Sequence, residues 1–156
     1  MGGQKVTINE TSSTTYQNGT GSGSASASSI TTGEAALVLG TVDSTTITAT
    51  QITIQPPGGD GSAAAKAAGV IAFQQGTPSP SKQVGQVPTN YTEGSGTIVS
   101  GSAANQATEA ALASYPGGIV DRVVQLSDGE YEVHNIGCNW PHHMFVSTDF
   151  KVLGAE

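Results

Sequence analysis

The stretch HNIGCNWPHH, residues 134–143, gathers the residue types of this chain that are best suited to chemistry. It holds all three histidines, the single cysteine and the single tryptophan of the 156-residue sequence. Imidazole and thiolate are preferred ligands of zinc and copper, so one hypothesis is a metal site. Its ligands would be His134, Cys138, His142 and His143. The other hypothesis is that Trp140 closes the end of a small sheet and Cys138 packs as an apolar residue. Structural metal motifs usually combine two short-spaced ligand pairs, and this single loose cluster therefore favours the packing interpretation.

The sequence offers no residue pattern that is typical of catalysis. A reactive thiol needs a base within hydrogen-bond reach and usually a helix N-terminus that lowers its pKa, whereas Cys138 follows a strand pattern. The G-x-S-x-G motif of serine hydrolases does not occur in the chain. We therefore expect no enzymatic activity and assign no catalytic residue.

Three acidic residues, Asp128, Glu130 and Glu132, stand close together in the run DGEYE. This run lacks the D-x-D-x-D-G pattern of a calcium loop. Its alternation along a strand instead predicts a solvated face that keeps a hairpin soluble. Asp121 and Arg122 of the adjoining strand are expected to pair across with these carboxylates.

The overall composition excludes several classes of partner. The formal net charge is -7, and only five residues are Lys or Arg, too few for the basic stripe that nucleic acid or an anionic membrane surface requires. No apolar run approaches the length of a membrane-spanning helix, so no membrane insertion is expected. Abundant Gly, Ser and Thr with 5% aromatic residues favour β-structure with many turns and are common outside the cell. The opening Met-Gly-Gly runs directly into a strand pattern, so we expect that it stands in place of an export leader.

The first part of the chain, residues 4–56, has the pattern of short strands separated by turns. Alternating apolar and polar residues predict strands near residues 5–16 and 45–55, with a change of face between Ala49 and Ile52 that is typical of a bend. The run LVL at residues 37–39 lies between glycines and predicts a buried strand. Residues 19–29 contain no apolar side chain larger than alanine, so we expect a mobile loop there.

The middle of the chain, residues 57–101, is rich in Pro, Gly, Thr and Gln and is expected to be an irregular, partly packed linker. Within it, SAAAKAAG predicts one or two helical turns capped by Asp60 or Ser62. Val70, Ile71 and Phe73 form a short apolar cluster. Such a segment is expected to lie along the surface of the folded protein.

The last part, residues 102–156, predicts a helix followed by a three-stranded antiparallel sheet. Apolar residues recur at helical spacing up to Tyr115, with Ser102 or Asn105 as the N-cap, and the run PGG then ends the helix. The runs IVDRVVQL and EYEVHNIG flank the turn SDG, which is a strong hairpin signal. The closing run MFVSTDFKVLG supplies the third strand. The expected fold class is therefore α+β to mainly β.

Residues 110–154 resemble a PepSY-like unit of small exported bacterial proteins. The carrying features are the helix, the PGGIV turn and strand, the DGEYEV hairpin and the closing VSTDFKVLG run. More loosely, residues 4–54 are similar to a secreted β-repeat of unknown function that folds as a partial OB-like antiparallel barrel, through VTINETSSTTY, GEAALVLGTV and TTITATQITI. Entry into this repeat after its first strand implies an open sheet edge. The resemblances imply an exported or cell-surface location and carry over no active residue.

These features predict a non-enzymatic structural or interaction protein, secreted or in the cell envelope, that binds a protein partner or a second copy of itself through an open strand edge. One alternative is a regulatory module, because PepSY-like units are associated with the modulation of peptidases. Its binding surface would consist of Tyr131, Trp140 and His142, which we expect to be exposed at one end of the sheet. The other alternative is a module that binds zinc or copper through the histidine and cysteine cluster; apart from such a metal, no cofactor is expected.

Overall fold

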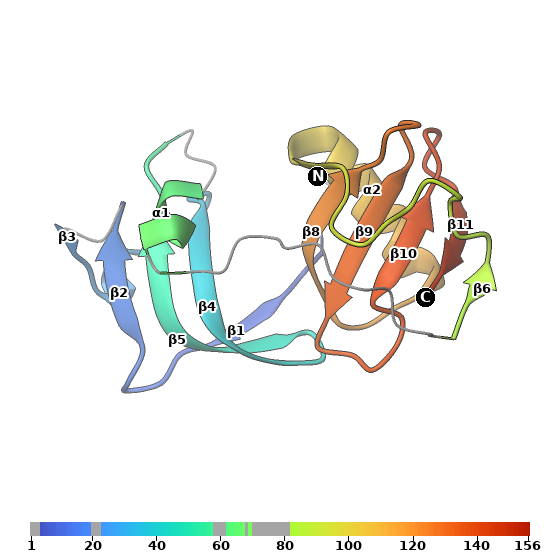
Figure 1. Cartoon of the computed structure of the whole chain (residues 1–156). Helices are drawn as coiled ribbons and strands as arrows, with labels where there is room; N and C mark the ends of the chain where they lie inside the picture. Colours follow the sequence, from blue (N-terminus) through green and yellow to red (C-terminus); the bar gives the residue numbers. More distant parts are fainter. Residues whose placement is uncertain (1–3, 20–22, 58–61, 68, 70–81) are drawn as a thin grey trace. The chain divides into compact units, whose positions relative to one another are not determined.

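The chain forms two compact units in the computed structural model, which describes residues 4–19, 23–57, 62–67, 69 and 82–156 (Figure 1). The N-terminal unit comprises Thr7–Thr41 and Thr46–Phe73. The C-terminal unit comprises Met1–Val6, Val42–Thr45 and Gln74–Glu156. The C-terminal unit is thus assembled from three separate stretches of sequence.

The N-terminal unit contains a five-stranded sheet built around one long strand. Its strands are β1 (Thr7–Asn9), β2 (Thr15–Asn18), β3 (Gly23–Ser24), β4 (Ala36–Asp43) and β5 (Thr46–Ile54). β5 pairs in parallel with β1 along its first residues and with β2 along its last residues, and it also pairs with β4. A short 3-10 helix, η1 (Ala27–Ser29), and helix α1 (Ser62–Ala67) complete the unit.

The architecture of the N-terminal unit differs from the expected antiparallel barrel. The sheet does not close, and β1 and β2 run parallel to β5. The partner of β5 changes from β1 to β2 between Thr48 and Gln51, where the sequence predicted a bend. Residues 23–29, expected to be loop, contain β3 and η1, whereas the predicted helical turns of SAAAKAAG are confirmed by α1.

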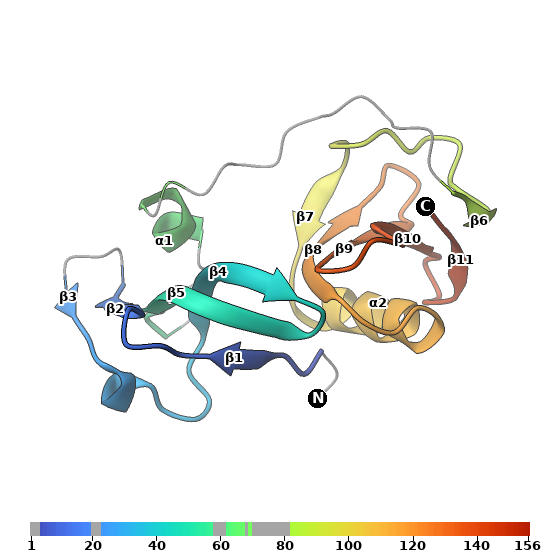
Figure 2. The same cartoon turned by 90° about the horizontal axis from the view of Figure 1, so that it is seen from below.

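The C-terminal unit is an antiparallel six-stranded sheet covered on one face by a helix. The strand order is β6-β11-β10-β9-β8-β7. The bounds are β6 (Val84–Gly85), β7 (Thr97–Val99), β8 (Ile119–Gln125), β9 (Tyr131–Ile136), β10 (His143–Val146) and β11 (Val152–Ala155). Helix α2 (Gly101–Ser114) lies behind this sheet in Figure 1, while the chain between β6 and β7 crosses its front face. Figure 2 shows the same two layers from below, on opposite sides of the sheet.

The core of this unit lies between α2 and the strands. Ala107 and Ala111 of the helix are fully buried against Val133, Met144 and Val146 of the sheet. Because side chains alternate along a strand, the neighbours of these core residues point to the opposite face. The small alanines bring the helix close to the sheet, which fits the predicted alanine-rich helical face.

Several sequence predictions for the C-terminal unit are corrected by its structure. The closing run forms two strands, β10 and β11, because Phe150 adopts a φ of +59° in a turn in which the Ser147 amide donates to the Lys151 carbonyl. β6 and β7 come from the expected linker and add two strands to the sheet. The helix begins earlier than predicted, with Ser100 as its N-cap residue. The hairpin of β8 and β9 is confirmed.

The predicted apolar cluster of Val70, Ile71 and Phe73 lies outside the described residues, as does Asp60. Within the described part of the chain, no helix combines the length and apolar character needed to cross a membrane.

Candidate functional site

A cluster of charged and aromatic side chains occupies the face of the C-terminal sheet opposite α2. The strand register aligns Arg122, His134 and His143 in one row across β8, β9 and β10. Val124, Glu132 and Phe145 form the next row. Polar residues on a buried sheet face require partners, because an unpaired charge away from water is costly. The partners found here define the candidate site.

Glu132 is the most deeply placed charged residue of the cluster. It is fully buried, and its Oε1 lies 2.6 Å from Nδ1 of His143. The hydroxyl of Tyr91 lies 3.0 Å from the same nitrogen. Tyr91 belongs to residues 86–96, the covering segment, which crosses this face between β6 and β7 (Figure 1). The ring of Tyr91 packs edge-on against Phe145 at 4.7 Å between centroids.

The burial of Tyr91 has an electrostatic consequence. Loss of hydration and the nearby Glu132 carboxylate together raise the pKa of the Tyr91 hydroxyl far above its usual value. Tyr91 therefore stays neutral and acts as a hydrogen-bonding group in the cluster.

A second carboxylate and imidazole pair lies beside the first. Asp121 Oδ1 contacts Nδ1 of His134, and its Oδ2 lies 3.2 Å from the Arg122 guanidinium. The rings of His134 and His143 are 5.1 Å apart between centroids, with an interplanar angle of 68°. Each imidazole thus presents Nδ1 to an acidic oxygen, and we assign the proton of the neutral ring to that nitrogen.

Glu132 does not lie where its sequence pattern predicted. It was expected on a solvated hairpin face, but the covering segment buries that face, so both faces of β9 are enclosed. Asp121 was expected to lie across from the carboxylates of the hairpin, and it contacts His134 instead. Tyr91 was not identified at all, because its role depends on where a loop crosses the sheet.

The four residues proposed as metal ligands do not share one centre. Cys138 donates its thiol to the Pro141 carbonyl and accepts a hydrogen bond from Asn135, both at 3.3 Å. His142 is exposed, with Nδ1 3.4 Å from the Asn135 carbonyl oxygen. Across the residues that the structure describes, no group of three or more His, Cys, Asp or Glu side chains is arranged to hold a metal ion. Only His134 and His143 are brought together.

Tyr131 lies apart from the other two residues proposed for ligand binding. Tyr131 is only 8% exposed and stacks on Phe150, so its expected exposure is wrong. It opens β9, whereas Trp140 lies beyond the other end of that strand. The indole of Trp140 donates to the Lys82 carbonyl at 2.8 Å, and the Lys82 ammonium lies 4.3 Å from its ring centre. Trp140 is therefore engaged within the unit.

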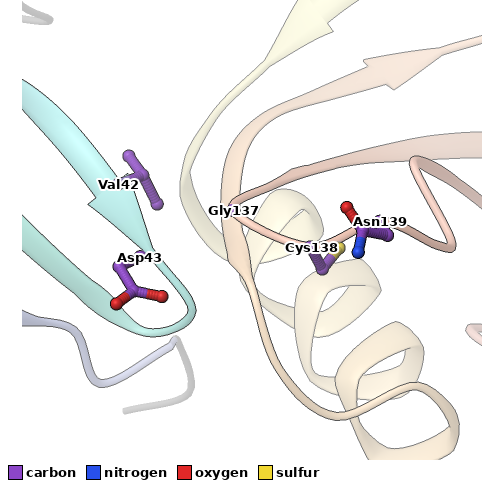
Figure 3. A pocket seen from close by; sticks show the side chains of 5 residues that line it. All are labelled: Val42, Asp43, Gly137, Cys138 and Asn139. Carbon is purple, nitrogen blue, oxygen red and sulfur yellow. The ribbon is translucent and has the colours of Figure 1, made fainter.

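Figure 3 shows a pocket of the C-terminal unit. It is lined by Val42 and Asp43 from the end of β4, and by Gly137, Cys138 and Asn139 after β9. The Ser44 amide donates to the Gly137 carbonyl at 3.2 Å, which fixes the turn against this loop. Burial raises the pKa of the Cys138 thiol, so a smaller fraction of it is thiolate than in a free cysteine at the same pH.

The N-terminal unit presents a different feature, the outer edge of β4. This strand has eight residues and pairs with β5 on one side only among the described residues. Residues 37–39 (LVL), expected to be buried, are only partly buried because β4 lies at the sheet edge. Its single charged residue is Asp43, and it contains no proline or lysine. Gly40 lets β4 approach β5 closely, since a Cβ there would lie 2.1 Å from the Thr48 carbonyl oxygen.

No protein-family model, no curated protein and no solved structure matches this chain.

Proposed function

We propose that the protein is a non-enzymatic interaction protein that associates with a second copy of itself through the outer edge of β4. The observation that carries the proposal is the outer edge of β4, which pairs with no strand in the part of the chain that the structure describes. An edge strand presents unpaired backbone amide and carbonyl groups, and proteins that stay monomeric usually block such edges with lysine, proline or a bulge. β4 has the length of a full strand and carries three adjacent partly exposed apolar residues instead.

The charge of β4 favours one orientation of the second copy. A parallel pairing would place Asp43 beside Asp43 of the partner, and like charges directly opposite each other are destabilising. An antiparallel pairing centred between Leu39 and Gly40, the midpoint of β4, places Asp43 opposite Ala36 of the second copy and Leu37 opposite Val42. This register separates the two carboxylates and brings apolar residues of both copies together. This arrangement is isologous and closes into a dimer with two-fold symmetry.

We further propose that the protein works outside the cell, on the cell surface or as a secreted protein. The low content of charged residues and the abundance of Gly, Ser and Thr support this location. The resemblance of residues 110–154 to PepSY-like units of exported proteins supports the same proposal.

The test is the mass of the protein in solution by sedimentation equilibrium over a wide range of concentrations. The unmodified protein is expected to approach a dimer as its concentration rises. Val38→Lys places a charge in the centre of the proposed interface, and it is expected to keep the protein monomeric. A second variant, Thr41→Lys, alters an exposed position of the same strand and guards against an effect of Val38→Lys on folding.

The matched control is Ile98→Lys in β7, at the edge of the other sheet, where the residue is 57% exposed. This variant is expected to dimerise like the unmodified protein. A monomer at every concentration would refute the proposal. Loss of the dimer in Ile98→Lys alone would move the interface to β7.

A further inference from the structure

We propose that His134 and His143 together bind one transition-metal ion of the zinc and copper class through their Nε2 atoms. This inference goes beyond the proposed association and involves a different unit of the chain. The two residues face each other directly across β9 and β10 in the strand register. Cross-strand neighbours on one sheet face have their Cβ atoms about 4.5–5.5 Å apart, which is close enough for both rings to reach one ion.

The chemistry of the two rings supports binding. Each Nδ1 faces a carboxylate oxygen, from Asp121 for His134 and from Glu132 for His143. A neutral imidazole whose Nδ1 carries the proton offers its lone pair at Nε2, and such a carboxylate is the usual partner of a metal-binding histidine. It fixes the tautomer, limits rotation of the ring and increases the electron density on the ligating nitrogen.

The separation of the rings also fits one ion. Metal–nitrogen distances are about 2.0–2.1 Å, and with roughly 1.1 Å from nitrogen to ring centre, two imidazoles on a tetrahedral ion have centres about 5 Å apart. The observed separation is 5.1 Å. The angle of 68° between the rings is compatible, because two imidazoles on one tetrahedral ion need not be coplanar.

The net charge around the two histidines and their exposure to solvent are both compatible with a bound cation. Two carboxylates, Asp121 and Glu132, flank the pair against one guanidinium, Arg122, so the site is net negative before the ion binds. The side chains of His134 and His143 are 16% and 14% exposed, which gives solvent access at the rim. Two protein ligands leave the other coordination positions to water. Cys138 and His142 hydrogen-bond elsewhere and are not ligands.

The test uses the full chain without an affinity tag, titrated calorimetrically with zinc chloride and separately with copper(II) sulfate. One ion per chain is expected. His134→Gln is expected to weaken binding at least about tenfold, the size of loss that even second-shell changes produce. His142→Gln is the matched control, because it removes the exposed histidine outside the pair and is expected to bind like the unmodified protein.

Two further measurements distinguish a loss of metal binding from a loss of folding. Asp121→Asn retains both imidazoles, and it is expected to weaken binding through ring positioning alone. Pulsed electron paramagnetic resonance of the copper(II) form is expected to show two coupled imidazoles, and one in His134→Gln. The proposal is overturned if no ion binds, if His134→Gln binds as well as the unmodified protein, or if only His142→Gln loses binding. None of these outcomes bears on the β4 dimer, which is read out by mass.

Discussion

At the scale of single residues, Glu132 shows how a charge becomes part of a sheet interior. Its carboxylate is fully buried and is held by His143, with Tyr91 sharing the same imidazole nitrogen. Removing the charge of such a buried carboxylate destabilises the folded protein, because its hydrogen-bonding partners stay away from water and lose a strong acceptor. The strand pattern EYEVH could not reveal this, since it fits a solvated face equally well.

Replacing this carboxylate tests that account. Glu132→Gln keeps the volume but removes the charge, and we expect the free energy of unfolding in urea to fall by about 1–3 kcal/mol. Glu130→Gln, on the same hairpin but outside the cluster, is expected to change it by less than about 0.5 kcal/mol. Equal effects of the two substitutions would contradict the special role of Glu132.

The thiol of Cys138 gives a prediction about pH. Burial raises its pKa above that of a free cysteine, so at any pH between neutral and mildly alkaline a smaller fraction is thiolate. Alkylation by iodoacetamide is therefore expected to be slower in the native protein than in urea, and its rate is expected to rise only at a higher pH. A native rate equal to the unfolded rate at every pH would show that the thiol is free in solvent.

At the scale of elements, the contact between α2 and the sheet depends on small side chains. Ala111 is fully buried against the strands, whereas Ala113 on the same helix is exposed. Ala111→Leu is expected to overpack this contact and to lower the free energy of unfolding by about 1–3 kcal/mol. Ala113→Leu is the control and is expected to have little effect in the same urea titration. Tolerance of leucine at residue 111 would mean that the helix is loosely packed.

The elements also show which parts of the fold are readable from sequence. The β8–β9 hairpin and α2 were predicted because their signals are local: a turn with Gly129, alternating residues, and helical spacing of alanines. β6 and β7 contribute only two and three residues, and their strand character comes from pairing with β11 and β8. No local pattern specifies such pairing.

The candidate site was only partly predictable from the sequence for the same physical reason. The sequence pointed to His134 and His143 through residue type, but it could not place Asp121 and Glu132 at their Nδ1 atoms, because that depends on strand register. The edge position of β4 was missed for a related reason. A run of LVL reads as buried whether or not another strand lies on its outer side.

At the scale of the whole molecule, the two units differ in the size of their cores. The fully or nearly buried apolar residues of the N-terminal unit among those described are Ala49, Ile52, Ile54 and Ala64, and the C-terminal unit contributes all the others. Since burial of apolar surface is the main favourable contribution to folding, we expect the N-terminal unit to unfold first. Hydrogen exchange measured peptide by peptide in increasing urea should show β5 losing protection before β9. A single shared midpoint would indicate that the units unfold together.

The discontinuous make-up of the C-terminal unit has a mechanical meaning. The side chain of Gln4 accepts from the Val120 amide at 2.9 Å and donates to the Gly118 carbonyl, and the backbone of Glu156 is hydrogen-bonded to His143. Tension applied between Gln4 and Glu156 would therefore pass through the C-terminal sheet alone while the Gln4 bonds last. The N-terminal unit would carry no load until they break. It would then serve as a reserve of length, released under strain while the remainder of the C-terminal sheet stays folded.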